Sequence, residues 1–213
     1  MEQMDLDINV QKAFGNLYRK QCILVAVQNE AGKVLLGAKP YFYPPTISRM
    51  LGGGVDEGEC VSVAVVREIA EELGVTFNES DFTPLFQLNT HATDEAGKKY
   101  NNQTYVYHVK IGNEKYQAGD DVKYILELTL GELHELGSAY EALPDTLWYK
   151  GPEGEFNWAD YGKMYGPIHK MTADKINRLN LSQSGPKATM GVDIFGKPDE
   201  DRNEKNPSTS GIR

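Results

Sequence analysis

Residues 52–75, GGGVDEGECVSVAVVREIAEELGV, constrain the fold of this chain more than any other stretch. The second half of the stretch has the composition of an α-helix, and Gly74 favours the left-handed conformation that ends one. Glu71 and Glu72 follow Glu68 by three and four residues, so the three carboxylates share one surface of that helix. Any fold of this chain must therefore accommodate a concentrated negative charge.

The apolar residues of the same segment predict which side of the helix faces the core. On a helical projection, five of them fall on one arc, opposite the three glutamates. These are Val63, Val66, Ile69, Ala70 and Leu73. Val61, Ala64 and Val65 share the glutamate side one or two turns earlier. We therefore expect the helix to be covered on both sides at its start and to open toward a cleft at its end.

The three glutamates predict a site for a divalent cation. Two like charges about 6 Å apart repel each other by about 3 kcal/mol at an effective dielectric constant of about 20, and a bound cation removes this repulsion. Carboxylate oxygens are ligands that Mg²⁺ and Mn²⁺ prefer. We therefore expect Glu68, Glu71 and Glu72 to bind Mg²⁺ (or Mn²⁺) as a cofactor. Glu57 or Glu59, near the start of the helix, can add a further oxygen.

The charge of the whole chain is concentrated around this helix. The net charge is −9, and residues 50–97 hold ten acidic residues and one base, Arg67. Arg67 can pair with Glu71 one turn along the helix, or reach Glu59 two turns back. The chain lacks the clustered lysines and arginines that bind a nucleic-acid backbone, so we expect no nucleic-acid partner. For the segment REIAEELG taken alone, a solvated surface helix is the alternative interpretation.

No segment predicts export or insertion into a membrane. The apolar stretches are all shorter than the roughly 20 residues that a membrane helix needs, and the first residues lack a signal-peptide pattern. The two cysteines, Cys22 and Cys60, lack the spacing of a metal site and are expected to be reduced thiols. We therefore expect a cytoplasmic protein with no membrane partner.

Apolar and alternating runs predict several short strands and two or three helices, which together indicate an α/β sandwich. The expected strands are residues 22–28, 34–39, 84–91, 104–111 and 123–130. The first two of these flank a turn that contains a glycine and should form a hairpin. The helices expected after the glutamate helix are residues 131–136 and residues 172–180, the latter capped by Thr172.

The length of the chain suits one sizeable core. We expect an N-terminal arm or helix over residues 1–20, because residues 10–18 are amphipathic, and one domain over residues 21–181. Residues 182–213 contain few large apolar residues and many Pro, Gly, Ser and charged ones. This composition predicts a mobile C-terminal tail.

Residues 53–75 resemble the complete signature sequence of the Nudix hydrolase family. The matching positions are Gly53, Glu59, Arg67, Glu68, Glu71, Glu72 and Gly74, with Ile69 and Val75 at the apolar positions. The resemblance implies a Nudix-type α/β/α sandwich with a mixed central sheet. It also implies magnesium-dependent hydrolysis of a small-molecule diphosphate, usually one linked to a nucleoside.

The resemblance also implies roles for individual residues. Glu68, Glu71 and Glu72 would be metal ligands. Glu71, Glu72 and Arg67 would act in catalysis. Glu59 would be a supporting residue. Gly53 would be the glycine of the loop that precedes the helix.

The residues around the signature leave several assignments open. The family often has a further acidic metal ligand just before a later strand, where this chain has Asp121, and a plain turn residue is the alternative. The candidates for the general base are Glu72, Asp120, Asp121 and Glu127. His91 and His108 lie on expected strands, and we interpret both as structural.

Two loops are candidates for binding the substrate. Backbone N–H groups can approach phosphate oxygens closely where side chains are absent, as in the triplet Gly52, Gly53 and Gly54. An aromatic triplet lies in the loop before it, and its rings either pack within the loop or stack on the substrate. These residues are Tyr41, Phe42 and Tyr43.

Three functions are compatible with the resemblance. The first is a metal-dependent hydrolase of nucleotides, nucleotide sugars, ADP-ribose or dinucleotides, and the second is a Nudix-type domain that binds such a compound without cleaving it. All signature glutamates are present, which favours the hydrolase. The third is an isopentenyl diphosphate isomerase, which needs a cysteine in the cleft; Cys22 and Cys60 fall in a strand and a helix. The sequence leaves the substrate and a possible homodimer undetermined.

Overall fold

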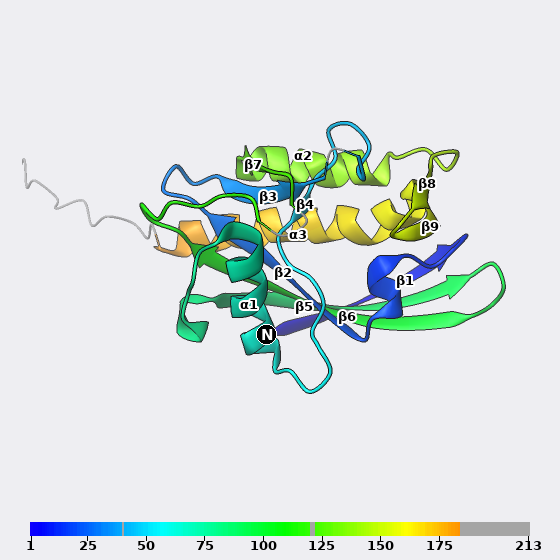
Figure 1. The fold of residues 1–213 in the computed structure, drawn as a ribbon, viewed down its shortest axis with the longest axis horizontal. Coiled ribbons are helices and arrows are strands. Elements are labelled where there is room, and N and C mark those ends of the chain that lie inside the picture. Colours follow the sequence, from blue (N-terminus) through cyan, green and yellow to red (C-terminus); the bar gives the residue numbers. More distant parts are fainter. Residues whose placement is uncertain (40, 120–121, 184–213) are drawn as a thin grey trace, which may run out of the picture. The chain divides into compact units, whose positions relative to one another are not determined.

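A seven-stranded sheet forms the centre of the fold (Figure 1). The computed structural model describes residues 1–39, 41–119 and 122–183. The strand order is β1-β5-β6-β2-β3-β4, and β7 pairs with β3. The strands are β1 (Glu2–Val10), β2 (Gln21–Gln28), β3 (Val34–Ala38), β4 (Arg49–Met50), β5 (Thr83–Asp94), β6 (Lys99–Lys110) and β7 (Tyr124–Leu128).

The sheet is mixed, as the family resemblance implies. β1 runs parallel to β5 and β2 runs parallel to β6. The pairs β2–β3, β3–β4, β3–β7 and β5–β6 are antiparallel. The predicted hairpin of β2 and β3 is therefore confirmed, and β5, β6 and β7 lie where the sequence predicts strands.

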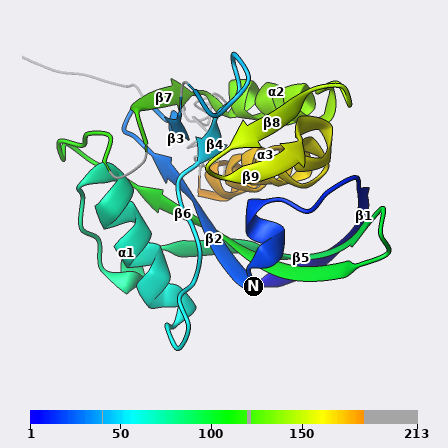
Figure 2. The ribbon, with the colours of Figure 1, turned by 45° about the vertical axis from the view of Figure 1, so that its right-hand side comes forward.

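Helices cover both faces of the sheet (Figures 1 and 2). The helix α1 (Val61–Leu73) lies on one face, and α2 (Leu130–Glu141) and α3 (Trp158–Gln183) lie on the other. Successive side chains of a strand point to opposite faces. Accordingly, Ile23 and Val25 of β2 pack in a cluster with α1, whereas Leu24 packs in a cluster with α2 and α3. The predicted α/β/α sandwich is thus observed.

Short elements complete the described chain. Two 3₁₀-helices, η1 (Gly15–Tyr18) and η2 (Glu79–Asp81), follow β1 and α1. A small hairpin of β8 (Trp148–Gly151) and β9 (Gly154–Asn157) precedes α3. Among the described helices, none is long and apolar enough to cross a membrane.

The first ten residues differ from the prediction. Residues 2–10 form β1, which pairs with β5 along its whole length, so the expected arm or helix is wrong for this segment. Apolar residues alternate with polar ones along it, which is the period of a strand. These apolar residues are Met4, Leu6, Ile8 and Val10. Only η1 is helical in the first twenty residues.

The last helix starts much earlier than predicted. It begins at Trp158, and Thr172 lies in its middle, where its hydroxyl donates to the carbonyl oxygen of Ile168 (2.7 Å) instead of capping the helix. Residues that usually interrupt helices concealed the earlier turns in the sequence. They are Gly162, Gly166 and Pro167. Of the expected mobile tail, residues 182 and 183 belong to α3, and residues 184–213 lie outside the described residues.

α2 and α3 approach each other closely because glycines line their contact. A Cβ atom on Gly137 of α2 would lie 2.7 Å from the carbonyl oxygen of Gly166, and one on Gly166 would lie 2.9 Å from that of Gly137. A Cβ atom on Gly162 would overlap the carbonyl oxygen of Tyr140. Backbone atoms cannot rotate away, so a larger residue would push the helices apart.

We predict that Gly162→Ala lowers the free energy of unfolding by about 1–3 kcal/mol, the usual cost of overpacking. The measurement is the urea midpoint followed by circular dichroism. Gly131→Ala in α2 is the matched control, because its Cβ atom would meet nothing closer than 3.9 Å. Alanine favours helix over glycine, so this control should be neutral or stabilising. Equal midpoints for the two variants would contradict the close contact.

Candidate active site

The face of α1 that packs on the sheet carries glutamate as well as apolar side chains. Ala64, Val65, Ile69 and Leu73 are buried, and Glu72 between them is only 5% exposed. The prediction of the core face is thus right for Ile69 and Leu73. The glutamates lie beside the buried face, at the edge where α1 meets the glycine loop.

The remaining residues of the predicted core face lie further out. Val63 is 46% exposed, so its assignment to the core is wrong, and Val66 and Ala70 are half-buried. The reason is that the small side chain of Ala64 and the short side chain of Val65 face the sheet. This rotates the helix relative to the projection from the sequence. Gly74 ends α1 in the left-handed conformation, as predicted (φ 68°).

The glycine loop contacts the glutamates directly. The backbone N–H of Gly52 donates to Oε2 of Glu72 (2.6 Å). A Cβ atom on Gly53 would lie 2.6 Å from both carboxylate oxygens of Glu68, so a side chain at that position would require the Glu68 carboxylate to move. Gly52 has a φ of 130°, a conformation that side chains rarely allow. The loop thus places its backbone against the carboxylates, where the sequence analysis expected phosphate.

Arg67 joins the loop to the helix. Its Nε and Nη2 atoms donate to Oε1 and Oε2 of Glu59 (2.9 and 2.8 Å). Its Nη1 atom donates to Glu68 (2.9 Å) and Glu71 (3.1 Å), and Nη2 also donates to the carbonyl oxygen of Gly54 (3.0 Å). Both pairings predicted from the spacing, with Glu71 and with Glu59, are therefore present.

These contacts change the ionisation of two carboxyl groups. The hydrogen bonds from Arg67 lower the pKa of Glu59 from 4.5 to about 2. Burial raises the pKa of Glu68, although the hydrogen bond from Arg67 opposes this change. A carboxylate that is buried without enough positive charge around it favours a bound cation.

The carboxylates of α1 are suitable ligands for a hard divalent ion, although two of them form hydrogen bonds with Arg67. Glu68, Glu71 and Glu72 offer carboxylate oxygens around one turn of α1 beside the pocket. Among the described residues, no group of three acidic, histidine or cysteine side chains is already arranged to hold a metal ion. Glu68 and Glu71 point toward Arg67 instead. Glu59 would still hold Arg67 if those two glutamates turned to a metal.

The other predicted acids are only partly placed. Asp120 and Asp121 lie outside the described residues. The loop before them approaches α1, since the N–H of Gly119 donates to the carbonyl oxygen of Glu72 (3.0 Å). Glu127 accepts hydrogen bonds from Tyr116 (2.7 Å) and from Asn29 (3.1 Å), and it does not line the pocket. The side chain of Glu57 is exposed.

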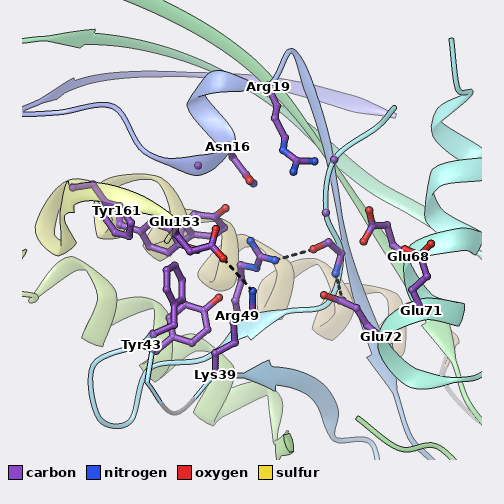
Figure 3. A pocket seen from close by; sticks show the side chains of 17 residues that line it. Asn16, Arg19, Lys39, Tyr43, Arg49, Glu68, Glu71, Glu72, Glu153 and Tyr161 are labelled. Atoms are coloured by element: carbon purple, nitrogen blue, oxygen red, sulfur yellow. Dashed lines mark hydrogen bonds and ion pairs between the residues drawn. The ribbon is translucent and has the colours of Figure 1, made fainter. Parts of the chain in front are cut away.

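A pocket of about 230 Å³ opens in front of the glutamates (Figure 3). The three glutamates of α1 and the glycine loop form one wall. The opposite wall contains cations and aromatic rings from four separate segments. Its residues are Asn16, Arg19, Lys39, Phe42, Tyr43, Arg49, Glu153, Phe156, Tyr161 and Tyr165. The pocket therefore has one acidic side and one side rich in hydrogen-bond donors.

The aromatic loop contributes to this pocket in two different ways. The ring of Phe42 packs against Tyr43 (4.9 Å between centroids) and Trp158 (5.4 Å), so loop packing is the role of these rings in this structure. Phe42 and Tyr43 also line the pocket, whereas Tyr41 is 97% exposed and does not.

The histidines and cysteines lie away from the pocket. His108 is buried on β6 beside Gln28 (3.0 Å), and burial lowers its pKa to about 4. His91 bonds Asn101 (2.8 Å) on the sheet surface. Cys22 is buried in β2, and Cys60 is exposed just before α1, not inside the helix as expected. None of these four lines the pocket.

Sequence reasoning missed the donor side of the pocket. Asn16, Arg19, Arg49 and Tyr165 belong to no recognisable motif, and they come together only through the packing of η1, β4 and α3. Of these residues, only Arg49 could have been suspected from the sequence, because it stands three residues before the glycine triplet that was predicted to bind substrate.

We predict that Glu59→Gln lowers the free energy of unfolding of the metal-free protein by about 1.5–3 kcal/mol near pH 7, the range for hydrogen bonds to charged groups. Folding depresses the pKa of Glu59, so this contribution is present above pH 4.5 and is lost as the pH falls toward 2. Denaturant midpoints of wild type and variant should therefore converge over that interval. Glu57→Gln, at an exposed position, is the matched control and should leave the denaturant midpoint near pH 7 unchanged.

Comparison with known proteins gives a domain match and several weaker similarities. The model of the NUDIX domain matches residues 18–146. RNA pyrophosphohydrolases from two strains of Caulobacter vibrioides (NA1000 / CB15N and ATCC 19089 / CIP 103742) are 40% identical over 79 residues. These matches cover 32% of this chain and 46% of each relative, so the chain spans about half the length of these curated relatives.

Solved structures show a more distant similarity. The MutT/nudix family protein from Enterococcus faecalis is 26% identical, with a TM-score of 0.42, over 51% of this chain and 43% of the other. A C. elegans Ap4A hydrolase is 17% identical, with a TM-score of 0.44, over 74% and 98% of the two chains. Since both TM-scores are low, the assignment rests on the domain match, which includes more than half of the chain. The chain belongs to the Nudix family.

Proposed function

We propose that the protein is a divalent-metal-dependent hydrolase that cleaves a diphosphate linkage in a small nucleoside diphosphate derivative. The observation that supports this most directly is that Glu68, Glu71 and Glu72 all border a pocket whose opposite side carries cations. Such a pocket suits a substrate that is anionic along its length and meets metal ions at one end. The name of the RNA pyrophosphohydrolase relatives supports a reaction of the same class.

The chain's own residues would prepare the site in three ways. Glu68, Glu71 and Glu72 would hold Mg²⁺ or Mn²⁺, which would neutralise the charge of the diphosphate oxygens and favour attack by water. Glu59 keeps Arg67 beside the metal ligands through two hydrogen bonds. The N–H of Gly52 keeps the Glu72 carboxylate in place at the edge of the pocket.

The competing function is a domain that binds a nucleotide without cleaving it. The complete set of signature glutamates disfavours it, because a binding domain does not need all three. The isomerase is not proposed, because neither Cys22 nor Cys60 lines the pocket. A cytoplasmic location and a homodimer remain compatible with this proposal.

We predict that wild type with Mg²⁺ releases phosphate or nucleoside monophosphate from at least one member of a panel of nucleoside diphosphate derivatives, and that EDTA abolishes the release. Glu71→Gln should lower kcat/KM by at least about 100-fold, since even outer partners of metal ligands contribute 10- to 100-fold. Glu71 is half-exposed, and among the described residues its side chain forms a hydrogen bond with Arg67 alone, so the variant should fold.

Glu135→Gln is the matched control, because Glu135 is an exposed glutamate on α2 outside the pocket. It should retain the activity of wild type. Full turnover by Glu71→Gln, or turnover by wild type in EDTA, would contradict the metal-dependent mechanism. Tight nucleotide binding without any turnover would instead favour the non-catalytic domain.

A further inference from the structure

The pocket wall opposite the glutamates is built from side chains that donate hydrogen bonds. We call Asn16, Arg19, Arg49 and Tyr165 the donor wall. Figure 3 shows Arg49 in the middle of the pocket, between the glutamates and the tyrosines, with Asn16 and Arg19 on the side of η1. None of these residues belongs to the signature sequence.

Arg49 has unused donor capacity at the centre of this wall. Its Nη2 atom donates to the carbonyl oxygen of Gly52 (2.8 Å), and its guanidinium lies 5.8 Å from the centroid of the Tyr165 ring. Over the described ranges, this is the only hydrogen bond of its side chain, and it forms no ion pair. A guanidinium has five N–H donors, so several remain for a ligand.

Arg19 is a second cation of the wall that forms no ion pair within the described residues. Its guanidinium lies over Gly54, where a Cβ atom would overlap Nη1. No hydrogen bond or ion pair of this side chain occurs with the part of the chain that the structure describes. Lys39 differs, because it lies 4.0 Å from Glu153 in an ion pair, so we do not count it in the donor wall.

Two buried groups of the wall also lack partners. Asn16 is 8% exposed and Tyr165 is fully buried. The Nδ2 atom of Asn16 and the hydroxyl of Tyr165 have no hydrogen-bond partner among the described residues. Buried donors are rarely left unpaired, because each unpaired one destabilises the protein. A ligand with many acceptors would supply the missing partners.

The donor wall combines residues from inside and outside the family domain, and its two cations, Arg19 and Arg49, lie within the matched range. Asn16 precedes residues 18–146, the range of the domain match, and Tyr165 follows it. The short helix η1 and the long helix α3 bring these two residues to the pocket. Two of the four members of this wall are therefore supplied by segments outside the matched domain.

We propose, on the basis of the proposed function, that the donor wall binds the terminal phosphate of a nucleoside polyphosphate. A terminal phosphate has a second pKa of about 6 and is dianionic near neutral pH, whereas each phosphate inside a doubly substituted diphosphate carries one charge. Two guanidiniums that form no ion pair with the described residues match the dianion, and the planar guanidinium group pairs with phosphate through two parallel hydrogen bonds.

The size of the pocket supports the same substrate. Its volume of about 230 Å³ is below the roughly 300–1,000 Å³ of pockets that enclose a whole drug-sized ligand. This volume suits a phosphate chain, and the choice between substrates then depends on the donor wall. The enzyme should accordingly prefer nucleoside di- and triphosphates over ADP-ribose and nucleotide sugars, which are substituted at both ends of the diphosphate.

The test compares ATP with ADP-ribose as substrates of the full chain with Mg²⁺. Arg19→Gln should lower kcat/KM for ATP by about 10- to 100-fold, the range for one hydrogen bond to a charged group. It should change kcat/KM for ADP-ribose by less than about 3-fold. Arg19 is exposed, so this variant should fold. Lys20→Gln, at the adjacent exposed lysine outside this pocket, is the control and should affect neither substrate.

A second measurement does not depend on turnover. Calorimetry with inorganic triphosphate in the absence of metal should show binding to wild type and to Lys20→Gln. Binding should weaken at least about 10-fold in Arg19→Gln and in Arg49→Gln, and Arg49→Lys should restore only part of it. Circular dichroism would verify that Arg49→Gln is folded.

The outcomes separate this inference from the proposed function. If wild type cleaves ADP-ribose as well as ATP, or if Arg19→Gln impairs both equally, the terminal-phosphate site is wrong and the hydrolase stands. If wild type cleaves no diphosphate, the proposed function fails, and the binding of inorganic triphosphate then tests the donor wall alone. Equal affinities of wild type and Arg19→Gln for triphosphate would show that the donor wall does not bind phosphate.

Discussion

Three carboxylates on one turn of a helix have to be balanced, and in this structure Arg67 balances Glu68 and Glu71 while the N–H of Gly52 donates to Glu72. The same guanidinium contacts Glu59 of the loop, Glu68 and Glu71 of α1, and the carbonyl oxygen of Gly54. Arg67 therefore neutralises part of the negative charge of the site and also attaches the loop to the helix. A divalent ion would replace only the part of it that involves Glu68 and Glu71, so the loop would stay in place when the site is filled.

The glycine loop connects the two sides of the pocket. The N–H of Gly52 contacts the Glu72 carboxylate, and its carbonyl oxygen contacts Arg49. One peptide segment thus fixes a proposed metal ligand on one side and a proposed phosphate ligand on the other. A phosphate chain that spans the pocket would have its terminal group at the cations and an inner phosphate at the glutamates. This order places the cleavable linkage beside the metal.

The parts of the structure that follow from local patterns could be predicted from the sequence. The spacing of Arg67 from Glu71 and from Glu59 predicted those two ion pairs, and the hairpin of β2 and β3 followed from its turn. The rotation of α1 could not be predicted, because a projection treats Val63, Ala64 and Val65 only by hydrophobicity, whereas contact with the sheet buries Ala64 and Val65 and leaves Val63 exposed. α3 was hidden by its glycines, which are used to approach α2 closely. The donor wall depends on contacts between residues almost 150 positions apart, for which the sequence has no periodic signal.

The central claim is that the glutamates of α1 bind a divalent ion, and a titration with Mn²⁺ followed by electron paramagnetic resonance tests it most directly. The account predicts that wild type binds Mn²⁺, that Mg²⁺ competes for the same site, and that Glu68→Gln weakens binding strongly while the fold is retained. The absence of Mn²⁺ binding to wild type, both alone and with nucleotide present, would contradict it. So would equal affinities of wild type and Glu68→Gln.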